Sequence, residues 1–92
     1  MNEHELTEWV KYNLDDCFMI IRENKSSYVR LETLIQIELL FQMIRIFHLE
    51  IAMPNREFYK KIISLIRTKR HYFRVQLLPE DLENEFIWSK KK

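Results

Sequence analysis

The residues of this 92-residue chain best suited to binding chemistry are cations grouped in its second half. Residues 56–78 hold seven Lys or Arg side chains and one acid, Glu57, whereas the net charge of the whole chain is only +1. Lys and Arg neutralise the phosphates of nucleic acids, and a basic stripe is the usual electrostatic sign of such binding. The sequence therefore predicts nucleic-acid contacts by Arg56, Lys60, Lys61, Arg67, Lys69, Arg70 and Arg74.

The same charges allow other interpretations. A basic helix face is often only a solvated surface, and this segment could equally dock on an acidic protein surface. Tyr59 and Tyr72 lie among the cations and could stack on the bases of a single strand. Salt dependence separates nucleic-acid binding from an adaptor that docks through apolar surface, because phosphate binding weakens steeply as salt rises and apolar docking does not.

Other reactive side chains do not form a recognisable catalytic or metal site. His4, His48 and His71 lack the spacing of metal ligands, and Cys17 lies on an apolar stripe, as a small buried side chain would. The chain has no Gly, which excludes a P-loop, a dinucleotide fingerprint and a nucleophile elbow. We therefore expect no enzyme activity, no metal and no cofactor. A lone Cys and a polar first segment predict a cytoplasmic protein without a signal peptide.

The element that positions the cations is the apolar stretch from residue 31 to residue 51. Thirteen of its 21 residues are Leu, Ile, Phe or Met, and Gly, Pro and Val are absent. These residue types favour a helix over the competing strand, and the charges within it oppose a membrane span. On a helix the apolar residues form two faces, so other helices must cover both sides. One face holds Ile37, Leu40, Ile44, Phe47 and Ile51, and the other holds Leu31, Ile35, Leu39, Met43, Ile46 and Leu49.

Flanking patterns predict the remaining elements. Apolar residues recur every three or four positions over residues 3–23, which indicates a first helix, capped by Asn2 or Thr7. Pro54 ends the central helix, and Asn55 caps a third helix over residues 56–70. Residues 71–78 fit either a strand or a continuation of that helix. Pro79 begins a short last helix that includes Phe86, Ile87 and Trp88.

The chain is thus predicted to be all-α, with one domain over residues 1–92 built from three long helices and a short C-terminal helix. The second and third helices are close enough in sequence for a helix-turn-helix. The predicted function is non-catalytic DNA binding in transcription regulation, with Arg56, Lys60 and Arg67 reading bases. The alternative is a helical protein–protein interaction module: an inhibitor, adaptor or chaperone subunit. A homodimer is expected, with an interface at Leu39, Met43, Ile46 and Leu49.

Overall fold

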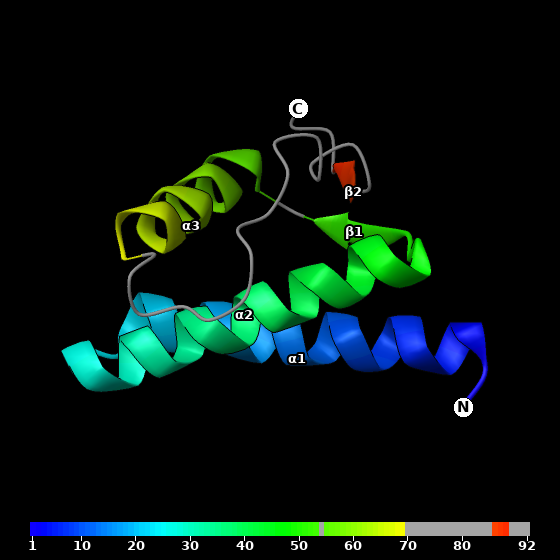
Figure 1. Cartoon of the computed structure of the whole chain (residues 1–92), viewed down its shortest axis with the longest axis horizontal. Helices are drawn as coiled ribbons and strands as arrows, with labels where there is room; N and C mark the ends of the chain where they lie inside the picture. The colour runs from blue at the N-terminus through cyan, green and yellow to red at the C-terminus, as the bar shows by residue number, and fades with distance from the viewer. Residues whose placement is uncertain (54, 70–85, 89–92) are drawn as a thin grey trace.

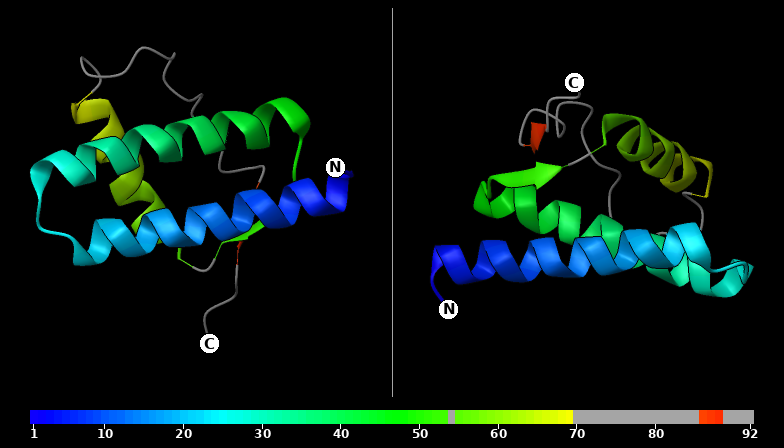
Figure 2. Two further views of the ribbon diagram at one scale, coloured as in Figure 1. Left: turned by 90° about the horizontal axis from the view of Figure 1, so that it is seen from below. Right: turned by 180° about the vertical axis from the view of Figure 1, so that it is seen from behind.

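The computed structural model describes residues 1–53, 55–69 and 86–88. Two long helices lie side by side as an antiparallel hairpin, and a third helix crosses one side of that hairpin next to a small sheet (Figures 1 and 2). The predicted all-α class is confirmed in broad terms, because helices make up most of the described chain. The elements in order are α1 (Glu3–Glu23), α2 (Ser27–Phe47), β1 (Ile51–Met53), α3 (Arg56–Thr68) and β2 (Phe86–Trp88).

Both helices of the hairpin begin at side-chain caps. The Asn2 carboxamide oxygen accepts a 2.8 Å hydrogen bond from the backbone N–H of Glu5, which selects Asn2 over Thr7 as the cap of α1. The Ser26 hydroxyl accepts a 3.4 Å bond from the backbone N–H of Val29 and caps α2. These bonds satisfy backbone donors that have no partner inside the helix. The predicted first helix is confirmed with its bounds.

The central helix is shorter at its C-terminal end than predicted. It ends at Phe47, and His48 takes the left-handed conformation with φ 51° and ψ 47°. The backbone N–H of Leu49 then donates a 3.0 Å bond to the carbonyl of Ile44, which closes the last turn. Ile51, predicted inside the helix, belongs to β1. The left-handed residue is normally Gly, so a chain without Gly gave no signal for this end.

The two short strands pair over a long sequence separation. β1 and β2 are parallel, with Ile51 opposite Phe86 and Met53 opposite Trp88. The predicted helix over Phe86, Ile87 and Trp88 is therefore wrong, because pairing with β1 holds these residues extended. The rest of that predicted helix and the ambiguous stretch 71–78 lie outside the described residues.

The connection from α2 to α3 differs from a helix-turn-helix. It runs over residues 48–55 and contains β1, whereas a helix-turn-helix uses a turn of about three or four residues. Asn55 caps α3 as predicted, and its side-chain oxygen accepts a 3.0 Å bond from the backbone N–H of Phe58. The sheet and the core, rather than a tight turn, therefore set the position of α3.

The core lies between the hairpin and the layer formed by α3 and the sheet. Phe41 of α2 is at its centre, with ring centroids 6.5 Å from Phe18, 5.7 Å from Tyr59 and 5.6 Å from Phe86. One aromatic side chain thus contacts α1, α3 and β2. Leu49, predicted at a partner interface, is buried in this core. The leucine follows the end of α2, so helical spacing does not apply to it. None of the described helices is long and apolar enough to span a bilayer.

Candidate nucleic-acid interface

Helix α3 has one buried side and one exposed side. Tyr59, Ile62 and Ile66 are buried, and they recur at the spacing of a single helical stripe. The opposite side is solvent-exposed and carries most of the cations predicted to bind phosphate. Glu57 is the only acid in the helix and lies in its first turn, where a carboxylate stabilises the helix dipole. The exposed cations are Arg56, Lys60, Lys61 and Arg67.

Three of these cations form a line along the helix. At 100° per residue, Arg56, Lys60 and Arg67 fall within about 40° of arc, over about 16 Å of helix length. Lys69 is half-buried just after the helix end, so it is less accessible than predicted. Arg70 and Arg74 lie outside the described residues. The structure therefore brings four of the seven predicted contacts onto one exposed side.

Two arginines near α3 are positioned by aromatic rings. The Arg56 guanidinium carbon lies 4.9 Å from the centroid of the Trp88 ring of β2. Arg22 of α1 lies 4.1 Å from the centroid of the Phe58 ring, and it is a cation that the sequence reasoning missed. Such cation–π contacts restrain a guanidinium and leave its N–H groups able to donate. The sequence feature that could have identified Arg22 is its position on α1, one turn after Phe18, which is buried.

The aromatic residues of α3 are core residues. Tyr59 is buried, and its ring centroid is 5.2 Å from that of Phe86 and 5.4 Å from that of Trp88. The predicted stacking of Tyr59 on bases is therefore wrong, because neighbouring rings cover it. Phe58 packs on Phe18 with ring centroids 5.3 Å apart. Tyr72, the second predicted stacking residue, lies outside the described residues.

Glu38 of α2 is a buried carboxylate that the sequence analysis did not single out. It is fully buried, and neither carboxylate oxygen has a hydrogen-bond partner within the described part of the chain. Burial disfavours the charged form and raises the pKa of Glu38 to about 7. The missed signal was its position one turn from Leu34 and Phe41, on the side of α2 that faces the core. Glu38 affects stability and not the exposed side of α3.

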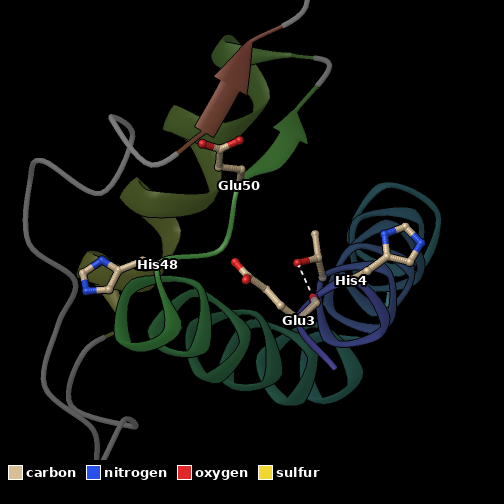
Figure 3. A pocket seen from close by; sticks show the side chains of 5 residues that line it. Glu3, His4, His48 and Glu50 are labelled. Atoms are coloured by element: carbon tan, nitrogen blue, oxygen red, sulfur yellow. Dashed lines mark hydrogen bonds between the residues drawn. The ribbon is translucent and has the colours of Figure 1, made fainter. Parts of the chain in front are cut away.

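A shallow hollow of about 390 Å³ lies where α1 begins and α2 ends. Figure 3 shows that the side chains of His4 and His48 lie on opposite sides of it, with the carboxylates of Glu3 and Glu50 between them. Among the residues that the structure describes, no group of His, Cys, Asp or Glu is arranged to hold a metal ion. The hollow therefore has mixed polar lining but no chemistry that we can assign.

Cys17 is buried in the hairpin, as its place in the apolar stripe predicted. Its thiol donates to the side-chain oxygen of Gln36 across a sulfur–oxygen distance of 3.7 Å. Burial raises the pKa of this thiol, and the nearby Asp16 carboxylate raises it further by a smaller amount. A raised pKa keeps the thiol protonated and poorly nucleophilic.

Comparison with known proteins finds no matching family model, no matching curated protein and no matching solved structure. Function must therefore be inferred from the chemistry of this chain's own surfaces. Two surfaces of the described residues differ from an ordinary mixed surface. One is the exposed cationic side of α3, and the other is the side of the α1–α2 hairpin that faces away from α3.

Proposed function

We propose that the protein binds nucleic acid without catalysis, through the exposed side of α3, as a small DNA-binding regulator. The observation that supports this proposal is the solvent exposure of Arg56, Lys60, Lys61 and Arg67 along one helix that contains a single acid. The buried side of the same helix packs on the core, so the cations are presented on a fixed support. A fixed array of charges loses less entropy on binding than charges on a mobile segment.

Phosphate contacts supply most of the affinity in this proposal. Each Lys or Arg that neutralises a phosphate releases a condensed counterion, which favours binding at low salt. Arg56, Lys60 and Arg67 lie in one line and are the residues proposed to approach base edges if α3 enters the major groove. The longer connection before α3 gives this helix a different setting from the recognition helix of a helix-turn-helix. We therefore expect weak sequence preference relative to phosphate binding.

The proposal is tested by a binding titration against random-sequence duplex DNA at several salt concentrations. With about four phosphate contacts, affinity should fall by about two orders of magnitude between roughly 50 and 200 mM salt. Fluorescence anisotropy of a labelled duplex measures the dissociation constant at each salt concentration. Absence of binding at the lowest salt would overturn the proposal.

A charge-reversed variant locates the binding surface. Lys60→Glu with Lys61→Glu should abolish binding at 100 mM salt, because it replaces two attractive charges by two repulsive ones. The matched control is Lys25→Glu with Arg45→Glu, which reverses two exposed cations outside α3. Far-UV circular dichroism should show the same helical signal in both variants. Equal loss of affinity in both would mean that overall charge, and not α3, determines binding.

The alternative function, a helical protein–protein interaction module, is favoured by a different observation. Large apolar side chains are exposed on both helices of the hairpin. A partner that docks there should bind with weak dependence on salt, in contrast to nucleic acid. The two functions are compatible, because the surfaces lie on opposite sides of the hairpin.

A further inference from the structure

Among the described residues, no element packs on the side of the α1–α2 hairpin that faces away from α3, and this side exposes large apolar side chains. Figure 2 (left) shows α1 and α2 side by side from below, with α3 behind them. Six large apolar side chains on these helices have exposed fractions between 37% and 60%, and all of them except Met19 lie on this side. We name this set the outer face: Trp9, Ile20, Leu39, Ile46 and Phe47.

Helical geometry places the outer face opposite α3. Phe18 of α1 contacts Phe58 of α3, and Trp9 lies half a turn around α1 from Phe18. On α2, Phe41 contacts Tyr59 of α3, and Leu39 points about 200° away from Phe41. A side chain that faces away from α3 on either helix is therefore not covered by that helix. The two helices contribute to one continuous surface because they pack side by side.

The outer face is as large as the largest apolar patch of a typical monomer. Its side chains expose roughly 500 Å², taking about 150–250 Å² for the full area of each aromatic side chain. The largest apolar patch on a typical monomer is about 300–600 Å² and is often functional. A standard interface buries about 800 Å² per partner, of which about 65% is apolar in homodimers. The outer face thus has the apolar area that one side of a homodimer requires.

Exposed acids lie on this side of the hairpin near both of its ends. Trp9, Ile46 and Phe47 lie where α1 begins and α2 ends, which is one end of the antiparallel hairpin. Glu5 lies one turn before Trp9 at that end, and Asp16, Glu23 and Glu32 lie toward the other end. The acids repel phosphate, so nucleic acid does not suit this surface. A partner for it should therefore be apolar opposite the outer face.

We infer that a second copy of this chain docks on the outer face, with the two outer faces in contact. A two-fold axis through the middle of the outer face brings the same apolar side chains of both copies into contact. Leu39 and Ile46 keep the interface role predicted from the sequence. Met43 is half-buried against the core and Leu49 is fully inside it, so the interface shifts toward α1.

This pairing determines where the two basic surfaces lie. Because α3 is on the opposite side of the hairpin, the exposed cations of the two copies face away from each other. One dimer therefore presents two separate nucleic-acid surfaces and can hold two duplex segments at once. This last consequence rests on the function proposed above, whereas the pairing of the two outer faces does not.

The oligomeric state in solution tests the pairing. Size-exclusion chromatography with multi-angle light scattering should give twice the chain mass of 11.5 kDa at micromolar concentration. Ile46→Glu and Leu39→Glu, tested separately, should each raise the dissociation constant of the dimer at least about tenfold, because each places two like charges in an apolar contact. The matched control is Ile87→Glu, which changes an exposed isoleucine of β2 outside the outer face. It should remain a dimer.

Each outcome of this experiment decides for or against the pairing. A dimer that is lost in both outer-face variants, kept in the control and unchanged at 0.5 M salt (about a 3–4 Å screening length) supports it. A monomer at about 100 μM, or a dimer unaffected by either variant, overturns it. Growth beyond two copies that disappears at high salt also overturns it, because that behaviour indicates basic α3 docking head-to-tail on exposed acids of the hairpin. Equal circular dichroism spectra show that the variants remain folded.

A second assay separates failure of the pairing from failure of the proposed function. Beads that carry one duplex should retain a second, labelled duplex in the presence of the wild-type protein and of Ile87→Glu. Ile46→Glu should bind a single duplex with the same affinity but retain no labelled duplex. If no form of the protein binds DNA, the proposed function fails while the mass measurement still decides the pairing. If DNA is bound but the mass is that of a monomer, only the pairing fails.

Discussion

Helices α2 and α3 pack on the same core, but they present different surfaces to solvent. Helix α3 has its apolar residues on one side, and its other side is polar and basic. Helix α2 is apolar on both sides: one contains Phe41 and Ile44 in the core, and the other contains Leu39 and Ile46 in solvent. A helix that is apolar on one side buries its apolar side chains by packing on one core. A helix that is apolar on two sides buries them only when both sides are covered. This difference suggests polar binding through α3 and apolar association through α2.

The largest effect is expected from a test of the two sides of α2. Phe41→Ala should lower the free energy of unfolding by about 3–5 kcal/mol, because it leaves a cavity between α1, α3 and β2. At a protein concentration low enough to keep the chain monomeric, Phe47→Ala on the same helix should lower it by less than about 1 kcal/mol, since more than half of that residue is exposed in a single chain. Urea unfolding followed by circular dichroism measures both values. Similar losses in the two variants would mean that the two sides of α2 are equally buried.

The next effect concerns the one acid on the buried side of α2. The pKa of Glu38 is about 7 in the folded chain, raised by burial from an ordinary value of 4.5. The folded state therefore holds the proton more tightly than the unfolded state, and its stability is greatest below about pH 4.5. The free energy of unfolding should fall by about 3 kcal/mol as pH rises through 7, because the buried carboxyl becomes charged.

Glu38→Gln isolates this contribution, because it keeps the shape of the side chain and removes the titration. The free energy of unfolding is measured from pH 4 to pH 8 for the wild-type protein, for this variant and for Glu8→Gln. Glu8 is exposed on α1, so its variant should follow the wild-type curve. A wild-type curve parallel to that of Glu38→Gln over this range would show that Glu38 has the same pKa in the folded and unfolded states.

The smallest effect is expected at His48, where the connection from α2 to α3 begins. His48→Gly should raise the free energy of unfolding by about 1 kcal/mol, because Gly takes the left-handed conformation without a Cβ clash. His48→Ala keeps a Cβ and should give no such gain. Thermal unfolding of the two variants measures the difference between them. Equal stabilities would mean that the left-handed turn at residue 48 carries no strain.

Local patterns in the sequence predicted most of the helices and the cationic site. Apolar spacing predicted α1 over residues 3–23, Asn55 predicted the start of α3, and the charge count predicted which side chains that helix exposes. These features depend on residues one or two turns apart, so a single sequence contains the information for them. The all-α class and the two-sided character of α2 follow from the same spacing.

Contacts between distant residues were decided only by the tertiary structure. Phe86–Trp88 is a strand because it pairs with Ile51–Met53, which lies more than 30 residues earlier in the chain. Tyr59 is buried because rings from α2 and β2 surround it, and Glu38 is buried because the core covers the side of α2 that it shares with Leu34 and Phe41. A sequence pattern indicates which side of an element is apolar. The packing of the other elements determines how much of that side is covered and which polar groups are covered with it.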